Sequence, residues 1–105
     1  MTTGRSKKVK YGLKDLEKDY GPLTFGKLLE AHRLSEDLSQ SEMARKLKIS
    51  RQKLNDFEHE RRFPSLRMAA DIAKALGEHA PTWVSVVIEE MLRREELDFK
   101  VTLAG

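Results

Sequence analysis

The feature that most constrains the fold is a pair of helix starts placed close together in the sequence, at Ser39 and Ser50. Ser39 and Glu42 have the spacing of a capping box, in which the serine oxygen accepts a hydrogen bond from the amide of the third helical residue while the glutamate reaches back to the cap amide. Ser50 offers a second helix cap soon afterwards. The spacing therefore predicts two short helices joined by a tight turn.

The apolar residues of these two segments follow helical periodicity. Ala44 and Leu47 lie on the inner stripe of the first helix, and Leu54 and Phe57 lie on that of the second, which runs over about residues 51–58. Ala44 is small and stands where the two helices would cross. Two short helices that cross after a turn of about three residues have the geometry of a helix-turn-helix motif.

Three more helices are predicted around this motif. The first has Thr24 as its N-cap, the next is capped by Ser65 and stopped by Gly77, and the last runs from Pro81 to about Arg94. The sequence thus predicts an all-α bundle of five helices, and its 105 residues leave room for one core.

The C-terminal residues break the helical pattern. Leu97, Phe99, Val101 and Leu103 alternate with polar residues, which is the period of a half-buried β-strand. A lone strand leaves its backbone donors and acceptors unpaired, so we expect it to pair with the same strand of a second copy. Val9–Leu13 is a weaker candidate partner within the chain.

The last helix favours the same self-association, because its apolar residues cover more than the single stripe that a surface helix needs. Helix and strand together predict a two-fold dimer, and the alternative is a tail folded back on its own bundle. The predicted dimer interface comprises Trp83, Val87, Ile88, Met91, Leu97, Phe99, Val101 and Leu103.

These patterns divide the chain into three parts. Residues 1–22 are expected to form a flexible basic arm with room for a short helix, residues 23–80 the helix-turn-helix domain, and residues 81–105 a C-terminal helix and strand that extend it for dimerisation. The arm is either a solubilising terminus or a segment that grasps phosphates or the minor groove of DNA.

Three stretches of the central region carry a family resemblance: Leu38–Leu47, Ile49–Glu58 and Arg62–Ser65. They resemble the Cro/CI (XRE) family of helix-turn-helix regulators, and the resemblance covers about residues 23–77. It implies a lambda-repressor-like bundle that binds double-stranded DNA.

The chain departs from the family pattern at two turns. Family members usually have glycine between the two helices and an Asn-Gly pair after the second, where this chain has Lys48 and His59-Glu60. A non-glycine residue at positive φ costs about 1 kcal/mol, so we expect the first turn to be kept and the second loop to be shaped differently. The resemblance also implies that Arg33 and Glu58 pair and tie the first helix to the second helix of the motif.

The net charge of +3 is unevenly distributed, with a basic start and middle and an acidic end, which suits an anionic polymer on one face. A recognition helix enters the major groove with its N-terminal residues nearest the bases. Arg51 and Gln52 occupy that first turn, where arginine can grip guanine and glutamine can grip adenine. Asn55 is a candidate reader of adenine, and Asp56 would either accept from cytosine or orient Arg51 or Gln52.

Phosphate contacts are expected from the start of the preceding helix, whose free amides and positive dipole attract anions, and from polar and basic side chains around the recognition helix. The predicted set is Gln40, Ser41, Ser50, Lys53, His59, Arg61 and Arg62.

The predicted function is therefore that of a homodimeric transcription regulator, a repressor that reads a pseudo-palindromic operator. The alternative is an antitoxin that represses its own operon and binds a toxin protein with the apolar C-terminal segment.

An enzyme, a cofactor and a metal are not expected. The three histidines, His32, His59 and His79, are scattered, cysteine is absent, and the sequence has no glycine-rich phosphate loop. No run approaches the about 20 apolar residues that a membrane span needs, so we expect a cytoplasmic, nucleoid-associated protein of a bacterium or phage.

Overall fold

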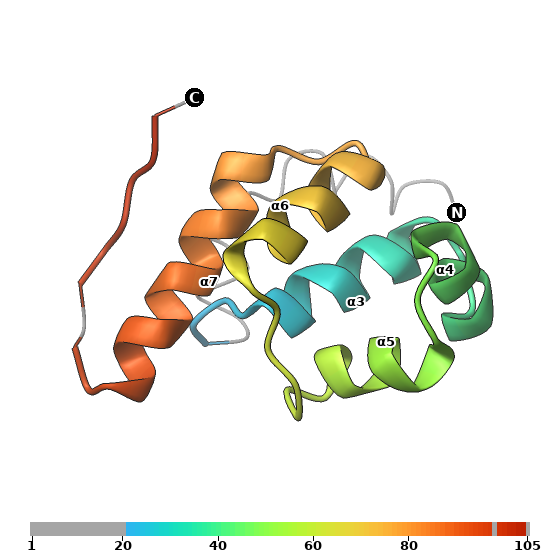
Figure 1. The fold of residues 1–105 in the computed structure, drawn as a ribbon, viewed down its shortest axis with the longest axis horizontal. Coiled ribbons are helices and arrows are strands. Elements are labelled where there is room, and N and C mark those ends of the chain that lie inside the picture. The colour runs from blue at the N-terminus through green and yellow to red at the C-terminus, as the bar shows by residue number, and fades with distance from the viewer. Residues whose placement is uncertain (1–20, 98, 105) are drawn as a thin grey trace.

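The computed structural model describes residues 21–97 and 99–104, and all five regular elements among them are α-helices. They are α3 (Phe25–Ser35), α4 (Gln40–Leu47), α5 (Arg51–Glu58), α6 (Leu66–Ala75) and α7 (Ala80–Arg94). Figure 1 shows α4 and α5 at one end of the molecule and α7 at the other, with α3 between them. The predicted all-helical bundle is confirmed. The predicted arm, apart from its last two residues, and the strand candidate Val9–Leu13 lie outside the described residues.

The helices begin at the predicted capping residues. The hydroxyl groups of Thr24, Ser39, Ser50 and Ser65 each accept a hydrogen bond from the amide three residues later. At Ser39 the capping box is complete, because Glu42 also accepts from the Ser39 amide. The local cap signals therefore suffice to place the starts of α3, α4, α5 and α6.

The joint between α6 and α7 follows the sequence signals with a shift of one residue. Gly77 has a φ of +73°, a conformation that favours glycine and that ends the preceding helix. Helix α7 begins at Ala80, one residue before the predicted start at Pro81. Pro81 still lies in the first turn, where the amide that proline lacks has no helical partner to lose.

All five helices contribute to the core, and its aromatic cluster lies where α3, α5 and α7 meet. The ring of Phe25 packs edge-on against those of Phe57 and Trp83, with centroid separations of 5.4 and 5.9 Å. Trp83 and Val87, which the sequence placed in a dimer interface, are only 5% and 2% exposed and belong to this core. Helix α7 is apolar on more than one stripe because it packs against both α6 and α3 of its own chain.

Gly26 allows α3 and α5 to approach each other closely. A Cβ atom at this position would lie 2.3 Å from the carbonyl oxygen of Phe57, far inside van der Waals contact. The obstacle is backbone rather than a flexible side chain, so it has little freedom to move. The crossing that sets the position of α5 therefore depends on the absence of a side chain at residue 26.

Both glycine-free turns contain a residue with positive φ. Lys48 ends α4 with a φ of +60°, and Glu60, after α5, has the same φ. The first turn is therefore kept without glycine. After Glu60 the chain turns back, because the amides of Arg61 and Arg62 both donate to the carbonyl oxygen of Asp56, at 2.8 and 3.3 Å.

The predicted C-terminal β-strand is not formed in the single chain. Residues 99–104 run beside α7 as an extended segment (Figure 1). Among the described residues there is no strand with which this segment could pair. The amide of Val101 donates instead to the Glu89 side chain on α7, at 2.8 Å. A strand needs a partner edge, and the described part of the chain supplies none.

Candidate nucleic-acid interface

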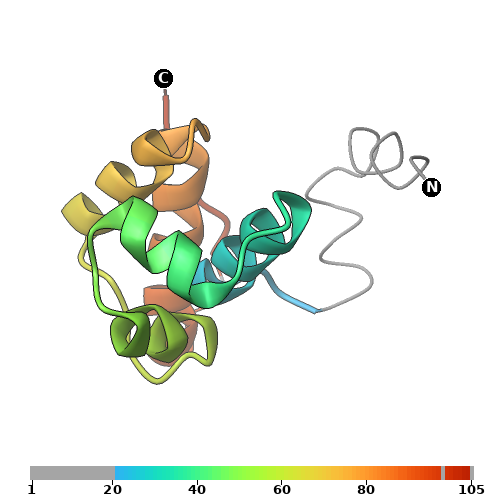
Figure 2. The same ribbon diagram turned by 90° about the vertical axis from the view of Figure 1, so that its right-hand side faces the viewer.

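Helix α5 has one buried face and one exposed face. Leu54 and Phe57 are buried in the core, whereas Arg51 and Gln52 in the first turn are exposed. Figures 1 and 2 both place this helix at the edge of the molecule, beside α4. Arg51 and Gln52 are therefore accessible at the end of α5 that, in a recognition helix, lies nearest the bases.

A buried ion pair ties α5 to α3. Arg33 donates to both carboxylate oxygens of Glu58, at 2.8 and 3.1 Å, and Glu58 has only 2% of its side chain exposed. The predicted pair is confirmed. The hydrogen bond to Glu58 is the main cause that raises the pKa of Arg33, which keeps this arginine charged. Two parallel bonds also fix the angle between the two helices.

Gln40, at the start of α4, connects this ion pair to the recognition helix. Its Nε2 donates to Glu58 at 3.0 Å, and its Oε1 accepts from Nδ2 of Asn55 at 3.2 Å. Gln40 was predicted to contact phosphate through the backbone amides at the start of its helix; its side-chain amide lies between two residues of α5. Nothing local predicts the bond to Asn55, which lies 15 residues further along the chain.

The side chains of Asn55 and Asp56 are both hydrogen-bonded to the loop that follows α5. Arg61, in the loop after α5, donates from Nη2 to Asn55 and from Nε to Asp56. Asp56 also accepts from Nε2 of Gln52 at 2.9 Å, and only 18% of its side chain is exposed. Asp56 therefore contacts Gln52, which is one of the two residues that it was predicted to orient.

The start of α4 keeps two amides available. The backbone N–H groups of Gln40 and Ser41 have no acceptor among the described residues, as expected in the first turn of a helix. Glu42 is part of the cap, and its pKa lies below the ordinary value because the amide and the hydroxyl of Ser39 donate to the carboxylate. Ser50 caps α5, so its oxygen already accepts from Lys53.

The remaining predicted phosphate contacts lie at or just beyond α5. Arg62 is exposed, and its side chain has no hydrogen bond or ion pair among the described residues. Lys53 is half-buried, and His59 is exposed with Nδ1 2.9 Å from the carbonyl oxygen of Asn55. The guanidinium of Arg61 is committed through Nε and Nη2, which leaves Nη1 for another partner.

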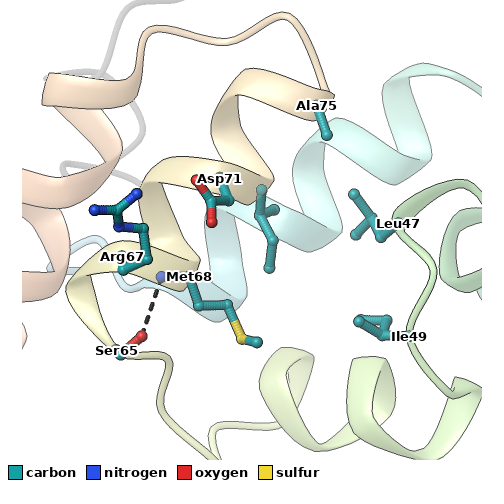
Figure 3. Close-up of a pocket in the computed structure, with 8 residues that line it drawn as sticks. Leu47, Ile49, Ser65, Arg67, Met68, Asp71 and Ala75 are labelled. Atoms are coloured by element: carbon teal, nitrogen blue, oxygen red, sulfur yellow. Dashed lines mark hydrogen bonds between the residues drawn. The ribbon is translucent and has the colours of Figure 1, made fainter.

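An apolar groove lies behind this surface, between the α4–α5 turn and α6 (Figure 3). Its volume is about 420 Å³, and Leu47, Ile49, Met68 and Ile72 supply much of its apolar lining. None of the residues predicted to contact DNA lines it. The groove is therefore separate from the reading surface.

Two negative observations apply to the described residues. No cluster of three or more His, Asp or Glu side chains there has the arrangement of a metal site. In the same part of the chain, no helix is both long and apolar enough to cross a bilayer.

Comparison with known proteins gives one match. A family model described as helix-turn-helix matches residues 29–83, just over half of the chain. The matched region runs from within α3 to within α7 and contains α4, α5 and the turn between them. The searches of curated proteins and of solved structures returned no match.

Proposed function

The chain belongs to the XRE (Cro/CI) family of helix-turn-helix DNA-binding regulators, and we propose that it is a homodimeric repressor that reads a pseudo-palindromic operator with α5 in the major groove. The observation that carries this proposal is the exposure of Arg51 and Gln52 on the first turn of α5, while the opposite face of that helix is buried.

Base reading is assigned mainly to these two side chains. Arg51 can bind guanine with two hydrogen bonds and Gln52 can bind adenine in the same way, and each such pair discriminates by about 1–3 kcal/mol. The side-chain oxygen of Asn55 accepts from Arg61, and one of its two N–H groups donates to Gln40. The second N–H is the donor that remains for a base.

The groups that flank the recognition helix supply the phosphate contacts, which fix the register of the protein on DNA. They are the amides of Gln40 and Ser41 and the side chains of Ser50, Lys53, His59, Arg61 and Arg62. Helix α4 adds its positive dipole end at the same place.

Dimerisation is assigned to the C-terminal segment and to the outer side of α7. Leu97, Phe99 and Leu103 are large apolar residues with 43%, 61% and 38% of their surface exposed. The amide of Val101 faces α7, and alternate backbone groups of an extended chain point the opposite way, so the second edge of the segment is directed outward. Two such edges related by a two-fold axis would form an antiparallel ladder. Ile88 and Met91, both half-buried on α7, would lie beside it.

The test of the proposed function is selection of binding sites from random DNA, followed by affinity measurements at fixed salt. We expect an inverted repeat with half-sites about 34 Å, one helical turn, apart. Replacing both Arg51 and Gln52 with alanine should remove the preference for this site over random DNA. Arg62→Ala is the matched control, since it should weaken binding to all DNA alike and reduce the salt dependence. An unchanged preference in the double variant would contradict the proposal.

The dimer is tested by the solution mass of the full chain and of Phe99→Asp. We expect a dimer for the unmodified chain and a monomer for the variant, because the variant would have to bury an unpaired aspartate in the proposed interface. Leu34→Asp is the control, since Leu34 is 58% exposed on α3 and lies outside the proposed interface. A monomer that assembles only with the product of a second gene would favour the antitoxin alternative, with the same apolar segment covering a toxin protein.

A further inference from the structure

Asp56 is the acidic residue of the proposed reading surface, and two side chains donate to one oxygen of its carboxylate. The atom Oδ1 accepts from Gln52 at 2.9 Å and from Arg61, whose Nε and Nη2 lie 3.1 and 3.0 Å away. An acidic side chain that faced DNA without a partner would be repelled by phosphate. Asp56 is instead neutralised by Arg61 and bonded to a neighbour on its own helix.

The orientation of each amide between Arg33 and Arg61 is dictated by a charged group. A carboxylate only accepts hydrogen bonds, so the NH₂ group of Gln40 faces Glu58 and its oxygen is left for Asn55. From the other end, a guanidinium only donates, so the oxygen of Asn55 faces Arg61. Glu58 at one end of the network and Arg61 at the other therefore require the same orientation of the two side-chain amides. Only one arrangement of donors and acceptors satisfies all these bonds.

The same rule applies to Gln52. Because Asp56 only accepts, the NH₂ group of Gln52 faces it and uses one of its two hydrogens. One N–H and the oxygen Oε1 remain on this exposed side chain. A donor beside an acceptor is the pattern that matches the N7 and N6 positions of adenine in the major groove.

We propose that Asp56, held in place by Arg61, is a positioning residue that fixes the amide of Gln52 in the orientation that reads adenine, and that Asp56 itself contacts no base. This inference rests on the proposed function, because it requires α5 to enter the major groove. It assigns one base of each half-site to Gln52 and a supporting role to Asp56.

The experiment is a measurement of base preference, at each operator position, for the full-length chain and for Gln52→Ala, Asp56→Ala, Asp56→Asn and the double variant with alanine at both positions. Gln52→Ala identifies the position that Gln52 reads, where the unmodified chain should prefer adenine about tenfold or more. Asp56→Ala removes the acceptor, so the amide of Gln52 can turn over, and the preference at that position should fall to about two- or threefold. Asp56→Asn is the matched control, because Arg61 only donates and therefore holds the asparagine oxygen where Gln52 also donates to Asp56. It should keep most of the preference.

Coupling between the two residues distinguishes positioning from a general loss of structure. In the Gln52→Ala background, Asp56→Ala should change nothing further at the Gln52 position, because there is no amide left to orient. The position that depends on Arg51 should keep its preference in Asp56→Ala, which also shows that the variant is folded.

Three results would overturn the inference while leaving the proposed function intact. One is an Asp56→Ala protein whose preference at the Gln52 position is unchanged. Another is loss of a cytosine preference at a different base pair, which would make Asp56 a reader itself. The third is a preference at the Gln52 position for a base other than adenine. If the unmodified chain prefers no sequence at all, the proposed function fails and the inference fails with it.

Discussion

Two buried glutamates mark two regions of the molecule that are held together by different means. Glu58 and Glu90 are the buried charged residues of the described chain, at 8% and 6% exposure. Glu58, on the recognition helix, accepts two bonds from Arg33 and one from Gln40. Glu90, on α7, accepts from the amide of Phe25 at 2.8 Å, and burial is the main cause that raises its pKa.

The difference shows what each region must control. Directional bonds between charged partners set angles, and the α3–α4–α5 region needs fixed angles because it aims side chains at a groove. Around α7 the contacts are mainly apolar, with Trp83, Val86 and Val87 buried against the rest of the core. Apolar packing sets the distance between helices but tolerates small rotations. Two polar contacts join α7 to the start of α3: Glu90 accepts from the amide of Phe25, and Arg93 donates to the carbonyl oxygen of Leu23 at 2.8 Å.

The largest expected effect on stability comes from breaking the ion pair between Arg33 and Glu58. Glu58→Ala should lower the free energy of unfolding by about 3 kcal/mol, the lower end for a buried pair, because it leaves the half-buried Arg33 without its counter-charge. Urea denaturation measures this loss. Replacing both partners, with Arg33→Met and Glu58→Leu, should lose much less, since no unpaired charge remains. A double variant that is less stable than Glu58→Ala would show that packing, and not charge pairing, explains the loss.

A smaller loss is expected when the corresponding group near α7 is removed. Glu90→Ala leaves the buried amide of Phe25 without an acceptor and should lower the free energy of unfolding by about 1–3 kcal/mol. Glu90→Gln keeps an oxygen at the same distance and removes the buried charge, so it should cost less than about 1 kcal/mol. Equal losses in the two variants, measured by the same denaturation, would mean that the acceptor is unimportant.

The two regions should also respond to pH with opposite signs. The pKa of Glu90 is raised above its ordinary value of 4.5, so its contribution to stability is complete below that pH and is lost as the pH rises through the folded-state pKa. The pKa of Glu42, in the cap of α4, is lowered, so its contribution is present above pH 4.5 and is lost as the pH falls through the folded-state pKa.

Two glutamine variants separate these contributions. Unfolding free energies measured from pH 3 to pH 7 should show the unmodified chain losing stability relative to Glu90→Gln as the pH rises, and gaining it relative to Glu42→Gln. Glu60, Arg93 and Arg94 also act on Glu90, the first raising its pKa and the arginines lowering it. The same sign for both variants would contradict the assignment of burial as the dominant cause at Glu90.

Local signals carried most of what the sequence could predict. The caps at Ser39, Ser50 and Ser65 act within one helical turn, so they could be recognised without knowing the fold. The pair of Arg33 and Glu58 was found through the family resemblance, since nothing local connects the two residues.

Features that depend on a distant neighbour could not be predicted. Gly26 reads as a weak point in a helix until the backbone of α5 is placed against it. Trp83 and Val87 look like surplus apolar surface until α7 is seen to cover two helices. The C-terminal alternation indicates a strand, but a strand forms only against an edge, which the described residues of one chain do not offer.

The smallest effect concerns the backbone of the two joints that link these regions. Lys48 lies between α4 and α5, and Glu60 lies in the loop between α5 and α6. Both have a φ of +60°. Lys48→Gly should raise the free energy of unfolding by up to about 1 kcal/mol, because strain relief exceeds the added entropy of the unfolded chain. Glu60→Gly relieves the same strain but loses the hydrogen bond from Thr24 to Glu60, 3.0 Å long, so its gain should be smaller or absent. Thermal unfolding resolves this difference, since about 1 kcal/mol shifts the midpoint by about 4–8 °C in a domain of this size. If Glu60→Gly proves the more stable of the two, the bond from Thr24 contributes little to the stability of this joint.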